Sequence, residues 1–408
     1  MMNQLVSVDD KLNGKVYNYT YDAGGNLISE TVTDSNGTTS NAYEYNNSNW
    51  GDVLTSYNGQ NITYDEIGNP LTYRDGMSMT WKNGRQLATL TNGDTSISYG
   101  YDSDSVRTTK TVNGVKYTYA YLNGQLLYET RGDAKFYYSY DANGILYNVR
   151  YTLTDGDTEY SYYYTHNSRG DIVGIYNGVG ELKAHYEYDA WGNVISITDN
   201  NGNAITNPNH IGNLNPFRYR GYYQDTETGL YYLMSRYYDA VTHRFINADG
   251  YFQSGTSILD ANTFAYCGNN PVLNVDPLGT CKVPNYTSAG TYIGHTWKIK
   301  ESVPGVPGFC NVCKGYGSNA PSNTSHSFVI SSYTTPSTKK QDYNTWNKMA
   351  DSFGAIFCSL EVDFDAGFGF GFDVTDIFSI KAMGKHTLIS VHFDEQGFSF
   401  GKSDSVEV

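Results

Sequence analysis

The stretch YNYTYDAGGNLISE, residues 17–30, shows most clearly the local pattern from which the fold can be predicted. Aromatic residues alternate with smaller polar ones over YNYTYD, so the rings leave one face of an extended strand and the polar groups leave the other. AGGN then supplies glycine and asparagine, which tolerate a positive φ, next to an aspartate that can bond to the backbone two residues on. The stretch therefore predicts a strand, a tight turn and a second strand.

The same pattern recurs along the first half of the chain as a unit of about 20 residues. Two close copies are FYYSYDANGILYNV, residues 136–149, and AHYEYDAWGNVISIT, residues 184–198. Looser copies, which bring the number of units to nine, begin at Tyr43, Ile62, Met79, Ile97, Tyr117 and Tyr162. The aromatic anchors of the units, mostly 17 to 25 residues apart, are Tyr21, Tyr45, Tyr64, Trp81, Tyr101, Tyr121, Tyr140 and Tyr188. An isolated hairpin is marginal in water, so we expect the hairpins to stack and bury aromatic ladders.

The composition agrees with a mainly β protein of more than one domain. The 408 residues include 40 Tyr and 42 Gly, as expected for short strands and tight turns. A net charge of −15 argues against nucleic-acid binding by the repeats, because phosphate binding relies on clustered Lys and Arg. Residues 281–408 hold 10 Lys, no Arg and 12 acidic residues, a break that indicates a separate module. No apolar run reaches the ~18 residues of a transmembrane helix.

Residues 217–279 end the array with a sequence of their own. GLYYLMSRYYDAVTHRFINAD, residues 229–249, combines a Tyr-rich strand pattern with an Asp-Gly turn, and NNPVLNVDPLG, residues 269–279, adds further turns. The hairpin units resemble YD repeats of the RHS family. Residues 217–279 resemble the RHS-repeat-associated core domain that ends such arrays, most closely that of the Gram-positive wall-associated type of polymorphic toxin.

This resemblance implies a fold and a domain order. In the family the repeats spiral into a hollow β shell, the core domain plugs its end, and a variable carboxy-terminal toxin is enclosed. We therefore expect repeats over residues 1–210, the core domain over 211–279, and a candidate toxin over 280–408. Nine units would not close a shell, and the amino terminus starts inside a repeat without a secretion signal. We accordingly expect a carboxy-terminal portion of a longer chain with upstream repeats, secreted or associated with the cell wall.

The resemblance also implies an activity at the boundary. The family's core domain resembles an aspartyl autoprotease that cuts just after a DPxGL sequence. Carried onto this chain, the pair is Asp249 and Asp276, with Arg244 as a supporting cation. Two carboxylates brought close cannot both ionise, so one keeps a proton and donates it to the scissile carbonyl while the other activates water.

Two positions depart from the family's pattern at this boundary. Thr280 stands where the motif has Leu, and Gly250 follows Asp249 where the commoner pattern has Pro. Asp260, in the segment between the two motifs, is an alternative partner for the acidic pair. A boundary that is cut and one that only separates two modules therefore both remain open.

Residues 280–408 predict a small α+β module with mostly antiparallel strands. The segments 359–374, 379–395 and 397–408 each predict a strand, and further strands are expected around 295–300 and after residue 326. Residues 343–357 place Trp, Met, Ala and Phe at helical spacing and predict the one helix.

Chemical candidates in this module are histidines and cysteines. His326 could act as a general base, and His386 with His392, six apart on one predicted strand and near Asp394, could form a metal or acid/base site. For each histidine taken alone, an ordinary strand residue is the favoured interpretation. CNVC is half of a zinc ribbon without its second half, so two disulfides are favoured over a metal site among the tail cysteines, which are Cys281, Cys310, Cys313 and Cys358.

Two functions follow as hypotheses. The first is a secreted RHS-repeat toxin for competition between bacteria, with a cognate immunity protein as its partner and no cofactor. The alternative is a non-enzymatic cell-surface protein whose Tyr-lined repeats bind a partner or carbohydrate. An immunity gene directly downstream would favour the first.

Overall fold

The computed structural model describes residues 3–154, 158–250 and 261–280, and beyond them only the backbone of five short strands. The described residues up to strand β26 (Val283–Pro284) belong to one compact unit. A second unit contains β27 (Gly371–Asp373), β28 (Ile377–Ala382), β29 (Thr387–Asp394) and β30 (Gly397–Ser403). Each unit is described by itself.

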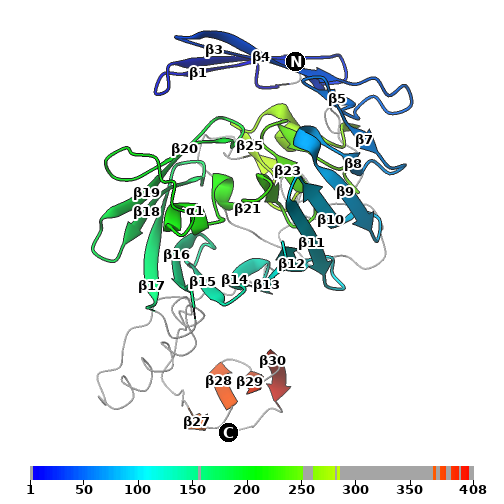
Figure 1. The fold of residues 1–408 in the computed structure, drawn as a ribbon. Coiled ribbons are helices and arrows are strands. Elements are labelled where there is room, and N and C mark those ends of the chain that lie inside the picture. Colours follow the sequence, from blue (N-terminus) through cyan, green and yellow to red (C-terminus); the bar gives the residue numbers. More distant parts are fainter. Residues whose placement is uncertain are drawn as a thin grey trace, which may run out of the picture. The chain divides into compact units, whose positions relative to one another are not determined.

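Two antiparallel sheets carry the repeats, with strands in chain order. The first has six strands, which are β1 (Ser7–Asp10), β2 (Lys15–Tyr21), β3 (Leu27–Asp34), β4 (Gly37–Glu44), β5 (Ser56–Tyr57) and β6 (Gln60–Asn61). The second has fourteen strands, which are β7 (Thr63–Tyr64), β8 (Pro70–Thr72), β9 (Ser78–Lys82), β10 (Gln86–Asn92), β11 (Thr95–Tyr101), β12 (Arg107–Val112), β13 (Val115–Leu122), β14 (Gln125–Arg131), β15 (Ala134–Tyr140), β16 (Leu146–Thr152), β17 (Tyr160–His166), β18 (Ile172–Asn177), β19 (Leu182–Tyr188) and β20 (Val194–Thr198). A short 3-10 turn, η1 (Arg74–Gly76), lies between β8 and β9. The second sheet curves without closing (Figure 1), which confirms the predicted hairpin array and partial β shell.

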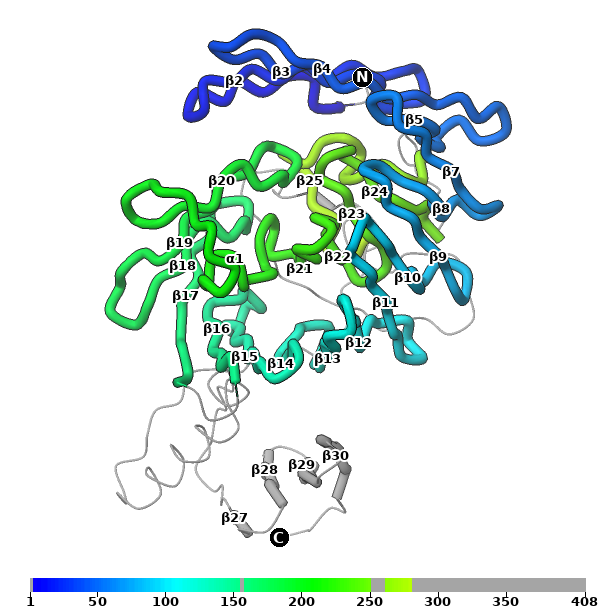
Figure 2. The backbone as a smooth tube through the Cα atoms, viewed as in Figure 1, coloured from blue at the N-terminus to red at the C-terminus, as the bar shows by residue number. Residues whose placement is uncertain are grey.

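The core domain lies within the curve of the second sheet (Figure 2). It begins with α1 (Ile211–Leu214) and a 3-10 turn, η2 (Tyr219–Gly221). A four-stranded sheet follows, formed by β21 (Tyr223–Asp225), β22 (Leu230–Tyr232), β23 (Tyr237–Asp239) and β24 (Arg244–Phe245). After η3 (Tyr266–Asn269), β25 (Asn274–Val275) pairs with β26. Repeats and core form one compact unit, and the expected domain boundaries at residues 210 and 279 stay predictions.

The aspartate of each close repeat copy builds the hairpin turn. In the first, Oδ1 of Asp22 accepts the backbone N–H of Asn26 at 2.8 Å, and Oδ2 accepts Nδ2 of Asn26 at 2.9 Å. Gly25 between them has φ 86°, which a side chain would disfavour. The second proton of Asn26 Nδ2 reaches the carbonyl of Gly51 at 3.2 Å. One Asp–Asn pair thus closes its own turn and ties it to a neighbouring segment.

The anchor aromatic residue links several units to the chain segment before them. The strand register shifts at Tyr21, Tyr140 and Tyr188, and such a bulge re-aims the side chain. Five of the eight anchors donate to a backbone carbonyl of an earlier segment, namely Tyr21 to Leu5, Tyr45 to Leu27, Trp81 to Pro70, Tyr140 to Leu126 and Tyr188 to Ile172. The Tyr-Asp dipeptide therefore has two separate tasks, a link backward and a turn forward.

One repeat turn also enters the core domain. Trp191 in the turn between β19 and β20 is fully buried. The hydroxyl of Tyr238 donates to its carbonyl at 2.7 Å, and that of Tyr231 donates to the Gly192 carbonyl at 2.9 Å. Nδ2 of Asn193 bonds both Oδ2 of Asp189, at 2.7 Å, and the carbonyl of Ala240, at 2.8 Å. This turn is a structural joint between repeats and core.

Replacing Asn193 by alanine tests that joint. The variant leaves the buried carboxylate of Asp189 and the carbonyl of Ala240 without this donor, so we expect the free energy of unfolding to fall by about 1–3 kcal/mol. Asn203→Ala is the matched control, because Asn203 closes the same kind of turn on Asp199 but is exposed and should cost no more than about 0.5 kcal/mol. Urea denaturation measures both. Equal effects of the two variants would show that Asn193 acts only within its own turn.

The second unit contains a four-stranded antiparallel meander in the order β27, β28, β29, β30. The segment 379–395, expected as one strand, instead contains the end of β28 and all of β29, which pair with each other from Ile377↔His392 to Ala382↔Thr387. Gly384 between them is the turn-favouring residue that the strand prediction passed over. The predicted helix 343–357 and the strands expected around 295–300 and after 326 lie outside the described residues.

Candidate active site

The candidate site is assembled from three turns of the core domain. Ser235 and Arg236 lie in the turn between β22 and β23, where the Leu233 backbone N–H bonds the Arg236 carbonyl at 2.9 Å and Met234 takes φ 62°. The guanidinium carbon of Arg236 lies 3.5 Å from the ring centre of Phe245 in β24. This cation–π contact fixes the guanidinium over the segment that leads to Asp249.

Arg236 contacts both members of the predicted carboxylate pair. Its Nη2 is 3.2 Å from Oδ2 of Asp249 and 3.4 Å from Oδ2 of Asp276. The three side chains are 5%, 7% and 3% exposed, so their charges interact with little screening by water. The structure thus brings together two carboxylates that are 27 residues apart in sequence, and both contact the same nitrogen, Nη2 of Arg236.

Backbone contacts fix each aspartate. The N–H of Asp249 donates to the Thr263 carbonyl at 2.9 Å, and Nη1 of Arg236 donates to the same carbonyl at 3.0 Å. The carbonyl of Asp276 accepts the hydroxyl of Tyr222 at 2.9 Å. Buried hydrogen bonds of this kind hold a reacting pair in one geometry before any reaction begins.

The DPLG boundary lies directly on this site. The carbonyl of Gly279 accepts Nε of Arg236 and, at 2.7 Å, the hydroxyl of Ser235. The N–H of Thr280 donates to Oδ1 of Asp276 at 3.0 Å. Gly279 has φ +70°, and a Cβ at that position would lie 2.9 Å from the Leu233 carbonyl oxygen. Only glycine fits so close to the turn that carries Arg236.

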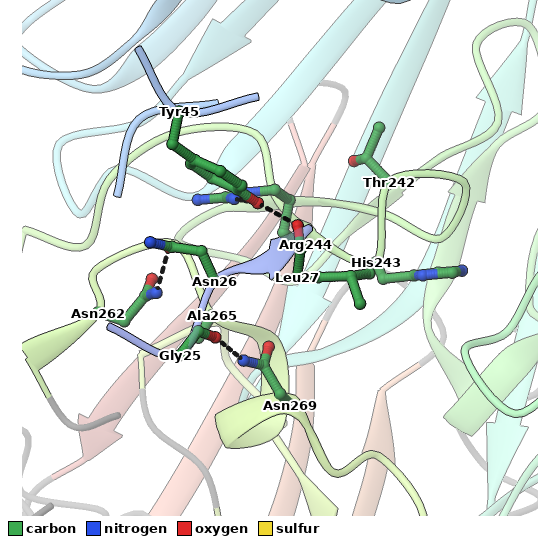
Figure 3. Close-up of a pocket in the computed structure, with 10 residues that line it drawn as sticks. All are labelled: Gly25, Asn26, Leu27, Tyr45, Thr242, His243, Arg244, Asn262, Ala265 and Asn269. Atoms are coloured by element: carbon green, nitrogen blue, oxygen red, sulfur yellow. Dashed lines mark hydrogen bonds between the residues drawn. The ribbon is translucent and has the colours of Figure 1, made fainter. Parts of the chain in front are cut away.

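Arg244, the cation expected from the sequence, lies elsewhere (Figure 3). Its guanidinium donates to the hydroxyl of Tyr45 and to the carbonyl of Asp52, so it joins the core domain to the first sheet. Arg236, and not Arg244, is therefore the cation that contacts both carboxylates. The two arginines lie in one sequence motif, but the turn after β22 directs Arg236, and not Arg244, toward the carboxylates.

Figure 3 shows the small polar pocket beside Arg244. Its volume is about 10 Å³, room for about one water molecule. Side chains across it are already paired, as with Asn262 and Asn26 at 2.8 Å. His243, which also lines it, is buried, and burial lowers its pKa to about 3, so the ring is neutral near pH 7. The pocket lies where the repeats contact the core domain.

The remaining candidates from the sequence fall mostly outside the described residues. Asp260, His326 and His386 lie there, as do the four tail cysteines. His392 and Asp394 are in β29, of which only the backbone is described. Their proposed roles in catalysis or metal binding stay predictions.

Comparison with known proteins agrees with the repeat chemistry. A family model described as RHS Repeat matches residues 3–39. The tRNA3(Ser)-specific nuclease WapA of Bacillus spizizenii is 38% identical over 287 residues, which cover 68% of this chain and 11% of that protein. The tRNA nuclease WapA of Bacillus subtilis (strain 168) is 37% identical over 294 residues, again 68% of this chain and 11% of the relative. The chain is an RHS/YD-repeat protein.

A solved structure shows the same fold for this RHS protein. The crystal structure of TcdB2-TccC3-Cdc42 superposes with a TM-score of 0.51 at 21% identity, covering 65% of this chain and 13% of that one. The chain thus spans only about a tenth of the length of the relatives it matches. Within the part of the chain that the structure describes, no helix has the length and apolar character to cross a membrane.

Sequence reasoning missed Arg236 and Ser235. Both stand in the run GLYYLMSRYY, where Ser and Arg interrupt a pattern of apolar and aromatic residues. A buried arginine in such a run needs an anionic partner, and that is the signal that could have pointed to it.

Proposed function

We propose that this RHS protein is part of a secreted polymorphic toxin, whose core domain cuts its own chain at residues 279–281 and frees residues 280–408 as the effector. The observation that carries the proposal is the position of Asp249 and Asp276, both on Nη2 of Arg236 and both beside the DPLG boundary. The relatives and the solved structure support the shell around that site.

The residues of the site suit aspartyl chemistry. Hydrolysis by two carboxyl groups needs one ionised group to take a proton from water and one protonated group to supply a proton. Arg236 contacts both groups, so its positive charge reduces the electrostatic repulsion between the two carboxylates. The substrate is a segment of the same chain, which removes the entropy cost of bringing it to the site.

The effector's target is proposed from the relatives. The names of the Bacillus relatives describe nucleases that act on tRNA, so tRNA is the first substrate to assay with residues 280–408. The module has 10 Lys and no Arg, a weak basic complement for RNA binding, so DNA, nucleotide cofactors and lipid vesicles belong in the same panel. An immunity protein encoded directly downstream is the expected partner.

Intact mass of the purified 408-residue chain tests the cleavage. We expect two fragments that separate near residue 280 and whose amounts grow together with time. A single uncut species after prolonged incubation would overturn the proposed self-cleavage. Expression of residues 280–408 in bacterial cytoplasm addresses the effector separately. Growth that continues without defect would favour the alternative, a surface protein whose repeats bind a partner or carbohydrate.

A further inference from the structure

The peptide bond between Gly279 and Thr280 is held on both sides by groups of the site. Its carbonyl oxygen accepts two donors, the Ser235 hydroxyl and Nε of Arg236. Its N–H points the other way and donates to Oδ1 of Asp276 at 3.0 Å. Because the C=O and N–H of a trans peptide lie in one rigid plane and point to opposite sides of the C–N bond, the contacts fix the whole bond relative to Asp276.

Two donors on one carbonyl match the arrangement that stabilises an oxyanion. Hydrogen bonds to a carbonyl oxygen become stronger when negative charge develops on that oxygen. Donors that are already in position before the reaction do not have to reorganise. One donor here is charged and the other is neutral. Ser235 Oγ also lies 2.6 Å from the Leu278 carbonyl oxygen, so the single proton of this hydroxyl is shared between two neighbouring carbonyls.

We infer that the chain is cut between Gly279 and Thr280, with Ser235 and Arg236 as the oxyanion donors, Asp276 as the acid for the leaving nitrogen and Asp249 as the base for water. This inference rests on the proposed self-cleavage and deepens it. It differs from the family's pattern, which places the cut after the fifth residue of DPxGL, here after Thr280. The geometry assigns the bond one residue earlier, because the carbonyl that Ser235 and Arg236 hold belongs to Gly279.

The steps balance without any further reagent. Asp249 takes a proton from water as the water oxygen bonds to the Gly279 carbonyl carbon, and the carbonyl oxygen becomes an oxyanion held by Ser235 and Arg236. The Thr280 nitrogen is then no longer conjugated with the carbonyl and becomes basic. Asp276, which starts the cycle protonated, gives this nitrogen its proton as the carbon–nitrogen bond breaks. The products are a carboxyl group on Gly279 and a free amine on Thr280, and proton exchange with water resets the pair.

Gly279 supports this assignment independently of the hydrogen bonds. Its φ of +70° and the contacts a Cβ would make, 2.9 Å to the Leu233 carbonyl and 2.9 Å to Ser235 Oγ, show a backbone seated tightly against the turn of Ser235. Reacting groups gain most from a site when the scissile segment is held in one conformation. Because the backbone packs so closely against this turn, only glycine fits at position 279, the residue whose carbonyl carbon is attacked.

The experiment combines the position of the cut with its rate in the full chain. Amino-terminal sequencing and intact mass should show a released fragment that begins at Thr280. Ser235→Ala should slow cleavage by about 10²-fold, the usual loss for one oxyanion donor, and Ser235→Thr, which keeps a hydroxyl, should restore most of the rate. Ser235 is exposed in a turn, so thermal unfolding of both variants should match wild type.

Each other outcome has a defined meaning. A fragment that begins at Cys281 or later, or a Ser235→Ala chain that cuts at the wild-type rate, would overturn the inference while leaving self-cleavage intact. Equal slowing by Ser235→Ala and Ser235→Thr would also overturn the hydroxyl's role as donor. A wild-type chain that is never cut would remove the proposed self-cleavage and this inference with it.

Discussion

Asp276→Asn should abolish self-cleavage on the timescale of hours over which the wild-type chain is cut. Asparagine has the shape of aspartate, and its one carbonyl oxygen can still accept the N–H of Thr280 as Oδ1 of Asp276 does, while its amide group replaces the oxygen that contacts Arg236. It cannot hold a transferable proton on oxygen or carry a negative charge. Loss of a positioned acid or base costs about 10²–10⁴-fold in rate, and Asp249→Asn should have an effect of the same size.

Intact mass at a series of times measures this loss, with Asp104→Asn as the control. Asp104 is an exposed turn residue, and its amide variant should cut at the wild-type rate. Melting temperatures within a few degrees of wild type would show that Asp276→Asn remains folded. Wild-type cleavage by either Asp249→Asn or Asp276→Asn would contradict the assignment of the acidic pair.

The repeat half of the fold could be predicted because the residues of each unit specify its strands and its turn locally. The aspartate and glycine of YDAGGN specify the turn, and alternation of Tyr with polar residues specifies the strand. Both signals are local, so they can be recognised in the sequence without knowing the tertiary structure. The hydrogen bond from an anchor tyrosine such as Tyr21 to an earlier carbonyl could not be predicted, because it depends on a register shift at that tyrosine.

The candidate site was only half predictable for a related reason. Asp249 and Asp276 stand in recognisable motifs, and the structure places both on one arginine. Which arginine it would be depends on the path of the chain. The turn at Met234 places the side chain of Arg236 against Phe245. The side chain of Arg244, in contrast, contacts Tyr45. Arginine content alone does not distinguish them.

A second large effect is expected from a buried ionic cluster that joins the second sheet to the core domain. Oδ2 of Asp225, at the end of β21, is 2.6 Å from Nη1 of Arg107, and its Oδ1 is 2.9 Å from Nζ of Lys110. All three side chains are essentially inaccessible to water. Five tyrosine rings surround the Arg107 guanidinium within 6 Å, at residues 99, 119, 223, 232 and 237.

Asp225→Ala should therefore lower the free energy of unfolding by about 3–5 kcal/mol, because it leaves the buried Arg107 without its carboxylate partner and Lys110 with only the partly exposed Glu227. Urea denaturation of the full chain measures the change. Glu227→Ala is the matched control. Glu227 contacts only the Lys110 end of the cluster, at 3.0 Å, and is partly exposed, so its loss should cost no more than about 1 kcal/mol. Equal stability of Asp225→Ala and wild type would show that the tyrosine cage alone holds the cations.

The same carboxylate gives the protein a specific acid sensitivity. Burial alone would raise the pKa of Asp225, but the charges of Arg107 and Lys110 outweigh burial and lower it. A carboxyl whose pKa is depressed on folding stabilises the protein above its unfolded pKa, near 4, and loses that contribution as pH falls through the folded value. Wild type should thus lose stability steeply below about pH 4. Asp225→Asn, which has no charge to lose at this position, should show a shallower fall over the same range, because the ion pairs of residue 225 with Arg107 and Lys110 are absent at every pH.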